Sequence, residues 1–189
     1  MTVANRGRVL RAATSSFLAG GYRTSVDDIA RRAGLAKQTV YHHFPSKEAL
    51  FREVASEMAK HVLIELESGE DELRETLTRF AIAYRKRALG AQGIATFRTL
   101  VPEVPRFPAR ARAMYAASAG ELIRRLAGVL ARGAAKSKLR LDDPFFAAEM
   151  LLSMLGGQDR IRRLFAVPSP KNERARVARI VDCFLRAHQ

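Results

Sequence analysis

The chain has 189 residues, 48% of them hydrophobic and 28% charged, a composition typical of a folded protein that is long enough to bury a core. Its 33 Lys and Arg against 19 Asp and Glu give a net charge of +14. This charge favours a polyanionic partner such as nucleic acid or an acidic membrane surface. The alternative is that the composition is rich in arginine without any such partner. A single cysteine excludes an internal disulfide and a zinc site of several cysteines, and no stretch approaches the roughly 20 apolar residues of a membrane span. We therefore expect a cytoplasmic protein with no cofactor, no metal and no membrane partner.

Apolar residues recur at a spacing of three to four along nearly the whole chain, and no alternating run predicts a strand. We therefore expect an all-α fold of about nine helices. The first helix covers roughly residues 6–19 and ends at Gly20-Gly21. Thr24 is expected to cap the second helix in a capping box with Asp27, and this helix stops near Gly34.

The third helix, roughly residues 37–44, is stopped by Pro45, and Ser46 is expected to cap a long fourth helix. Three short helices, with Gly34 in a tight turn between the second and third, form a helix-turn-helix pattern. Positive charge is concentrated in the same region, because residues 1–47 hold eight Lys and Arg but only two acids. Together these features indicate a head that binds nucleic acid.

The third helix is expected to have two unlike faces. Val40 and Ala36 lie on one side and are expected to pack on Ile29 and Leu10. At about 100° per residue, the other side gathers polar groups within about 140°, namely Lys37, Gln38, Tyr41 and His42. Lysine can donate to guanine and glutamine can pair with adenine in the major groove. Further donors toward bases or phosphates are expected from Thr39, Tyr41, Ser46 and Lys47.

The adjacent histidines do not predict a metal or catalytic site. Neighbouring helical residues diverge by about 100°, whereas helical metal ligands stand four residues apart. A catalytic histidine needs a nucleophile and an orienting carboxylate, but Asp27 and Asp28 are explained as acids in the first turn of a helix. His43 is either a packed or capping residue or a phosphate contact.

The stretch TSVDDIARRAGLAKQTVYHHFPSKEALF, residues 24–51, resembles the N-terminal domain of the TetR family of bacterial transcriptional regulators. The residues that carry the resemblance, over about residues 8–55, are Thr24, Ile29-Ala30, Ala33-Gly34-Leu35, Thr39-Val40-Tyr41, Phe44, Ser46-Lys47 and Leu50-Phe51. The resemblance implies that residues 36–43 read bases and that Thr24, Tyr41 and Lys47 contact phosphates. Ala36 departs from the Ser or Thr of many members and cannot cap the recognition helix.

The resemblance also implies an all-α homodimer with a DNA-binding head, residues 1–47, and a ligand-binding and dimerisation body, residues 48–189. In that body the sequence predicts helices over roughly 70–90 and 91–101, an irregular segment 102–108 and a long helix to about Lys136. A helix starting at Asp143-Pro144 is expected to bend at Gly156-Gly157 before a last helix after Pro170. Residues 95–115 and 142–152 resemble the C-terminal region of AefR-like members.

Two sites are expected in the body. An inducer pocket is expected from side chains that could equally serve as core, namely Met58, His61, Phe80, Tyr84, Phe97, Phe107, Met114 and Tyr115. The last two helices are expected to form a four-helix bundle with a second copy, the alternative being that they complete the core of one chain. The expected interface residues are Phe146, Met150, Met154, Val177, Ile180, Val181 and Phe184, with Cys183 a buried, inert thiol beside them.

The sequence therefore predicts a ligand-responsive transcriptional regulator rather than an enzyme. It is expected to be a repressor that binds a pseudo-palindromic DNA operator as a homodimer and is released by a small-molecule effector. The alternative is a basic nucleic-acid-binding protein of the nucleoid type, which uses the same charge without reading bases.

Overall fold

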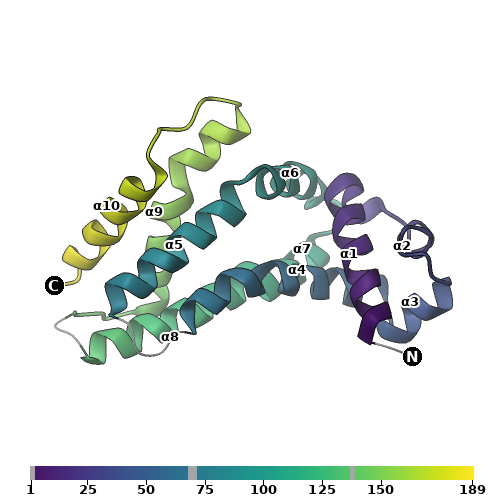
Figure 1. The fold of residues 1–189 in the computed structure, drawn as a ribbon, viewed down its shortest axis with the longest axis horizontal. Coiled ribbons are helices and arrows are strands. Elements are labelled where there is room, and N and C mark those ends of the chain that lie inside the picture. The colour runs from purple at the N-terminus through teal and green to yellow at the C-terminus, as the bar shows by residue number, and fades with distance from the viewer. Residues whose placement is uncertain (1–2, 68–71, 137–138) are drawn as a thin grey trace. The chain divides into compact units, whose positions relative to one another are not determined.

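The computed structural model describes residues 3–67, 72–136 and 139–189, and this part of the chain is helical, without a strand (Figure 1). It divides into two compact units. Unit 1 is Met1–Met58 with Ala95–Ser118, and unit 2 is Ala59–Ile94 with Ala119–Gln189. This division by packing differs from the head and body that the sequence predicts, because unit 1 also contains a segment assigned to the body.

Unit 1 begins with α1 (Val3–Gly20), a 3-10 turn (Gly21–Arg23), α2 (Val26–Ala33) and α3 (Lys37–His43), which pack on one another (Figure 1). It also holds most of α4 (Lys47–Leu63) and of α6 (Ala91–Leu100), and all of α7 (Pro108–Tyr115). Its core joins the helices of the head, because Leu10, Ile29 and Val40 are at most 8% exposed. The expected packing of Val40 on the first two helices is confirmed, whereas Ala36 is exposed.

The turn between α2 and α3 depends on one glycine. Gly34 ends α2 with a φ of 62° and a ψ of 41°, the left-handed region that costs glycine little and other residues more. The start of α2 differs from the expected capping box: Ser25, not Thr24, accepts the hydrogen bond of the Asp28 amide, and its hydroxyl donates to the Asp28 carboxylate. A hydroxyl residue therefore caps α2 as predicted, but one position later, because the Thr24 hydroxyl donates to the Ser16 carbonyl instead.

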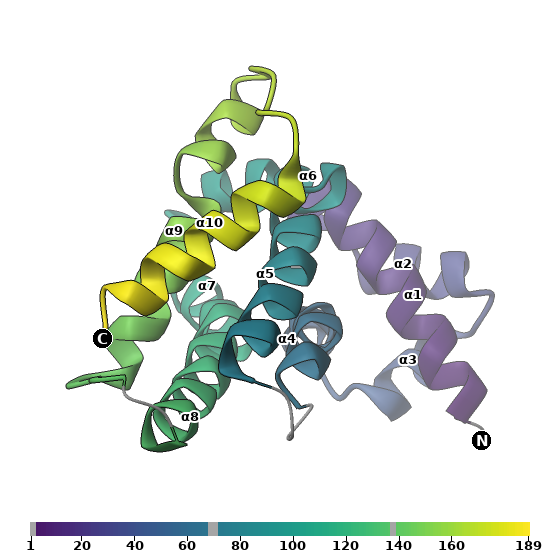
Figure 2. The ribbon, with the colours of Figure 1, turned by 60° about the vertical axis from the view of Figure 1, so that its left-hand side comes forward.

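Unit 2 consists of α5 (Leu73–Leu89), α8 (Glu121–Lys136), α9 (Pro144–Leu164) and α10 (Glu173–Arg186), with the end of α4 and a 3-10 turn (Ile64–Leu66). Figure 2 shows α10 lying along α9 and α5. The core between them contains large side chains without exposed surface, including Leu77, Phe80, Leu126, Leu130, Leu151 and Leu155. The expected cap of α9 is confirmed, since Asp143 accepts hydrogen bonds from the amides of Phe145 and Phe146.

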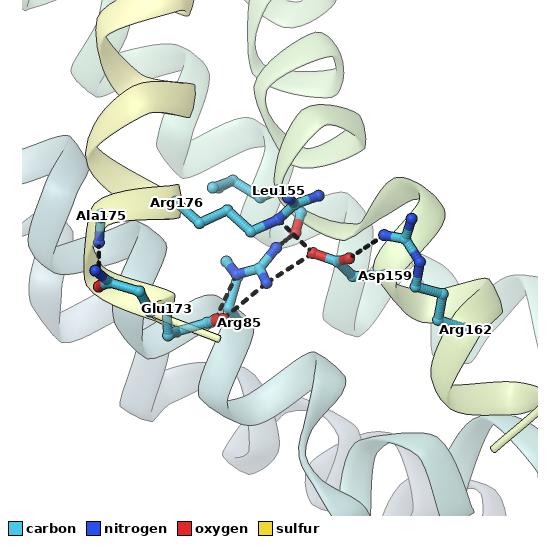
Figure 3. A network of polar contacts seen from close by, with 8 residues as sticks. Arg85, Leu155, Asp159, Arg162, Glu173, Ala175 and Arg176 are labelled. Atoms are coloured by element: carbon cyan, nitrogen blue, oxygen red, sulfur yellow. Dashed lines mark hydrogen bonds and ion pairs between the residues drawn. The ribbon is translucent and has the colours of Figure 1, made fainter. Parts of the chain in front are cut away.

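Helix α9 bends where the sequence predicts it. Gly157 has a non-helical φ of 6° and ψ of −120°, which breaks the ladder of backbone hydrogen bonds. Arg85 of α5, whose side chain is 1% exposed, donates to the Leu155 carbonyl next to this bend and pairs with Asp159 and Glu173 (Figure 3). Arg162 and Arg176 also bond Asp159, so one buried carboxylate joins α5, the second half of α9 and α10.

The predicted long helix up to Lys136 is two α-helices in the structure, α7 and α8. Between α7 and α8 the chain makes a π-helical turn, Ala116–Gly120. A π turn takes one residue more than an α turn. The proline-rich segment expected to be irregular contains a 3-10 turn, Val101–Glu103.

Candidate nucleic-acid interface

The predicted polar face of α3 is open to solvent. Lys37, Gln38, Tyr41 and His42 are exposed, with Tyr41 at 42%, whereas Val40 on the opposite side is 1% exposed. Thr39 is half-buried. Four polar side chains of the seven-residue α3 thus face outward while its apolar side holds it on the head. A short helix fixed in this way can lie in the major groove and present its side chains to base edges.

Lys37 is paired with an acid of the preceding helix. Its Nζ lies 2.9 Å from Asp27 Oδ2, and both side chains are about half exposed. The hydrogen bond to Asp27 and the charge of that carboxylate raise the pKa of Lys37, so the amine carries its proton at neutral pH. A contact with guanine therefore requires Lys37 to turn away from Asp27 or to serve both at once.

Thr24 and Ser46, which the sequence predicts to cap helices, both bond to the backbone. The Thr24 hydroxyl donates to the Ser16 carbonyl at 3.0 Å and so fastens the start of α2 to α1. Ser46 caps α4 as predicted, because its Oγ accepts from the Ala49 amide at 3.0 Å. Ala36 stands at the N-cap position of α3 with extended backbone and no side-chain bond, as its chemistry requires.

Lys47, at the first position of α4, lies against an aromatic ring. Its Nζ is 4.3 Å from the centroid of Tyr22, and the guanidinium of Arg110 from α7 is 4.7 Å from the same centroid. Arg110 also forms an ion pair of 2.9 Å with Glu48, and the Tyr22 hydroxyl bonds to that carboxylate. We call Tyr22, Lys47, Glu48 and Arg110 the tyrosine cluster. No spacing rule relates residues 22, 47 and 110, so only the fold reveals it.

Burial sets the proton affinities within the tyrosine cluster. Burial, together with the hydrogen bond to Glu48, raises the pKa of Tyr22 to about 12. Burial also lowers the pKa of Lys47, with the nearby positive charge of Arg110 acting in the same direction and Glu48 against it. The Tyr22 hydroxyl bond keeps the pKa of Glu48 below its usual value.

His43 has the packed position that was one of its two predicted roles. Its Nε2 is buried and has no hydrogen-bond partner within the residues that the structure describes. Its ring lies beside those of His42, at 5.4 Å between centroids, and Phe44, at 6.4 Å. Within the same described ranges, no three His, Cys, Asp or Glu residues are grouped so that they could hold a metal ion.

The residues predicted to line an inducer pocket do not form one group. Met58 and Met114 line a cavity in unit 1, and Met114 and Phe107 line a smaller one beside it. In unit 2, Phe80 is wholly buried in the core and the Tyr84 hydroxyl accepts a hydrogen bond from Arg160. The remaining three, His61, Phe97 and Tyr115, are exposed.

The residues predicted to form a dimer interface divide into two sets. Val177, Val181 and Phe184 are at most 1% exposed in the core of unit 2, so one chain already buries them, which was the alternative reading. The apolar stripe of α10 thus packs into the core of its own chain, so these three side chains do not fit an interface role. The other four, Phe146, Met150, Met154 and Ile180, retain exposed or half-buried surface. Cys183, expected to be buried, is exposed on the same helix.

The all-α fold and the outward polar face of α3 define a helix-turn-helix DNA-binding protein. The comparison with family models is consistent with this class: the model described as bacterial regulatory proteins, tetR family, matches residues 9–54, and that of the AefR-like transcriptional repressor C-terminal domain matches residues 75–189. The chain therefore belongs to the TetR family of bacterial transcriptional regulators, with a C-terminal domain of the AefR-like type. It is a transcriptional regulator rather than an enzyme.

Individual relatives agree with this assignment. The solved structure of the flavonoid-responsive regulator FrrA is 32% identical, with a TM-score of 0.76 over 100% of this chain and 98% of that one. A TetR family regulator from Pseudomonas syringae pv. tomato is 27% identical, with a TM-score of 0.70 over 98% and 97% of the two chains. The HTH-type regulator YhgD of Bacillus subtilis is 36% identical over 76 residues, 40% of this chain and 38% of YhgD, so the chain matches well under half the length of that curated relative.

No described helix is long and apolar enough to cross a membrane.

Proposed function

We propose that the protein is a ligand-responsive repressor that binds a pseudo-palindromic operator as a homodimer in the cytoplasm. Residues 1–47 serve as the DNA-binding head, and residues 48–189 bind the effector and the second copy. Lys37, Gln38, Thr39, Tyr41 and His42 contact base edges or the adjacent backbone, while Thr24, Ser46 and Lys47 contact phosphates. Half-sites are spaced by about one helical turn, roughly 34 Å, or a multiple of it.

The observation that carries the proposal is the division of α3 into a buried and an open side. Val40 is 1% exposed, and the neighbouring Tyr41 is 42% exposed. This arrangement fixes the orientation of the helix and leaves its hydrogen-bonding groups free of the core, as base reading requires. The net charge of +14 supplies the attraction to DNA.

Ligand response rests on the family and on one relative. FrrA is described as flavonoid-responsive, and this chain is similar to it along its whole length. A ligand that binds better to a conformation with a displaced α4 would weaken DNA binding, because α4 begins beside the head at Lys47. We infer release from DNA as the response.

Dimerisation through α9 and α10 is supported by their exposed apolar side chains. Phe146 of α9 is 64% exposed, and Phe165, just after α9, is 77% exposed. A groove of about 630 Å³ is lined by Met154, Ile180 and Cys183 together with the cationic Lys171, Arg176 and Arg179. Apolar surface of this kind on a helix pair is suited to an isologous contact with a second copy. Light scattering at micromolar concentration is expected to give twice the mass of 21.0 kDa, and a monomer there would exclude the dimer.

The experiment that tests DNA recognition is selection of bound duplexes from a random pool. We expect a two-fold symmetric sequence, bound roughly 10³-fold or more tightly than bulk DNA in competition. A nucleoid-type protein would enrich no sequence and would be displaced equally by all DNA. That outcome would replace the proposal by its alternative.

A further inference from the structure

A partly open cavity of about 110 Å³ lies in unit 1, between α1, α4, α6 and α7. Apolar side chains form most of its wall, notably Phe17, Phe51, Val54, Met58, Leu100 and Met114. None of the described residues that line it is charged. An apolar wall without a charged partner disfavours ions, because moving an unpaired charge out of water is costly.

Two of the three hydroxyl residues in the wall limit the chemistry of an occupant, the third being Thr96. The Thr14 hydroxyl donates to the Leu10 carbonyl, and the Ser118 hydroxyl donates to the Met114 carbonyl, each at 2.8 Å. Each hydroxyl has a single proton, so both oxygens can accept a further hydrogen bond but cannot donate one. An occupant is therefore favoured if it carries a hydrogen-bond donor.

The volume sets an upper limit on size. An apolar cavity of about 150 Å³ in another protein stays dry and binds benzene or xenon. At about 110 Å³, the cavity of unit 1 suits one small ring or a short aliphatic chain. A molecule with several rings exceeds this volume, so part of it has to extend out of the opening or the wall has to move.

The wall of this cavity reaches the DNA-binding end of α4. Phe51 packs edge-on against Tyr22, with 5.1 Å between the ring centroids, and Tyr22 in turn carries Lys47. A smaller cavity of about 30 Å³ shares Phe51, Leu100 and Met114 with the first and is bounded by Tyr22 and Arg110. An occupant that displaces Phe51 therefore moves the aromatic support of Lys47.

We propose that the cavity between α1, α4, α6 and α7 binds a small, uncharged, mainly apolar molecule with one hydrogen-bond donor, of the size of phenol, and that occupancy weakens the contact of Lys47 with DNA through Phe51 and Tyr22. The effect on DNA rests on the proposed function, whereas binding in the cavity does not. The two parts are measured separately.

Binding is tested by calorimetry on the full chain with phenol as the probe and benzoate as the charged comparison. We expect saturable binding of phenol and none of benzoate. Ala55 lines the cavity and is 7% exposed, so Ala55→Leu fills the space and is expected to weaken phenol binding by at least about tenfold. Ala95→Leu makes the same change on the exposed side of α6 and is expected to bind phenol as the native protein does.

A second variant keeps the test independent of any damage caused by overpacking. Met114→Ala enlarges the cavity and joins it to its smaller neighbour, so it is expected to reverse the preference of the native protein for phenol over 2-naphthol. Circular dichroism establishes that each variant is folded. Phenol binding that is unchanged in folded Ala55→Leu, or an unchanged preference in Met114→Ala, overturns the cavity site.

The effect on DNA is measured by fluorescence anisotropy with a duplex recovered in the selection described above. Phenol is expected to raise the Kd for this duplex severalfold in the native protein but not in Ala55→Leu. In Tyr22→Leu, which alters no residue of the larger cavity wall, phenol should bind without changing the Kd. Phenol that binds in the cavity but leaves the native Kd unchanged overturns the coupling. If the selection of duplexes enriches no sequence, the proposed function is contradicted. The calorimetric measurement of phenol binding still decides whether the cavity is a binding site.

Discussion

Lys47 lies over the ring of Tyr22, with its Nζ 4.3 Å from the ring centroid. The lysine is thus held in place by a cation–π contact in the absence of DNA. Arg110 and Glu48 complete the arrangement through their ion pair of 2.9 Å. Because the side chain is already partly ordered, binding a phosphate costs it less conformational entropy than it would cost a free lysine.

Replacement of Lys47 by alanine is expected to weaken binding to all DNA sequences alike. A phosphate contact carries no sequence information, and its loss lowers the salt slope of the affinity by about one. The measurement is Kd against salt concentration for a selected duplex and for bulk DNA. Lys86→Ala, the same change in unit 2, serves as the control. An unchanged salt slope in Lys47→Ala contradicts the proposed contact.

Removal of Asp27 is expected to have the opposite effect. Asp27 pairs with Lys37 on the predicted DNA side of the head, so Asp27→Asn frees the amine and removes a charge that repels phosphates. Affinity for bulk DNA is therefore expected to rise.

Lys37→Ala should instead lose about 1–3 kcal/mol of discrimination at one base pair. Anisotropy with singly mismatched duplexes distinguishes the two, and equal losses across all duplexes in Lys37→Ala would argue against base reading by this lysine.

Introduction of a cap at Ala36 is expected to stabilise the protein. Ala36 has the extended backbone of an N-cap, with φ −69° and ψ 147°. It has no side-chain oxygen, so it cannot accept a hydrogen bond from the free backbone amides at the start of α3. Ala36→Ser should raise the free energy of unfolding by about 1 kcal/mol. Ala95→Ser, on the exposed side of a helix, lacks that geometry and should be neutral or slightly destabilising. Denaturant unfolding of both variants provides the comparison.

Sequence reasoning predicted the head better than the body because the head contains marked signals at short range. Gly34, Pro45 and Ser46 each constrain the backbone by their own chemistry, and all three act as expected. The capping box was displaced by one position because Thr24 and Ser25 offer the same hydroxyl. Only the fold shows that Ser16 accepts the Thr24 bond and leaves the cap to Ser25.

Loss of the buried arginine in unit 2 is expected to be strongly destabilising. Arg85→Met leaves the Leu155 carbonyl without its arginine donor and removes one of the three arginines that bond Asp159, and breaking a buried pair costs up to about 3–5 kcal/mol. Arg74→Met removes a pair with Asp182 in which the arginine is 53% exposed, and it should cost at most about 1 kcal/mol. Urea unfolding measures both. Equal losses in the two variants would mean that the Arg85 network adds nothing beyond a surface pair.

Acid is expected to destabilise unit 2 partly through Glu121. Hydrogen bonds from Arg124 and then Arg125 lower the pKa of Glu121 from 4.5 to about 2. Since the folded pKa lies below the unfolded one, this contribution is complete above pH 4.5 and is lost as the pH falls to about 2. Arg124→Met is expected to flatten the dependence of unfolding free energy on pH in this window. Arg132→Met, on the same helix and without that contact, should not.

Prediction failed in the body where one apolar stripe suits either the core of the chain or an interface with a second copy. Val177 and Phe184 stand at core spacing on α10, and the same spacing suits an interface, so the sequence could not decide between the two. Packing decides it, because α5 and α9 cover these side chains within one chain. The residues predicted for one pocket were separated for a related reason: helix periodicity says which side is apolar but not which neighbour that side meets.

The π-helical turn at Ala116–Gly120 gives the chain a place to absorb the loss of one residue. A π turn holds one residue more than an α turn, so deletion of Ser118 alone should convert it to an α turn. Helix content measured by circular dichroism is then expected to stay unchanged, whereas the hydrogen bond from the Ser118 hydroxyl to the Met114 carbonyl is lost.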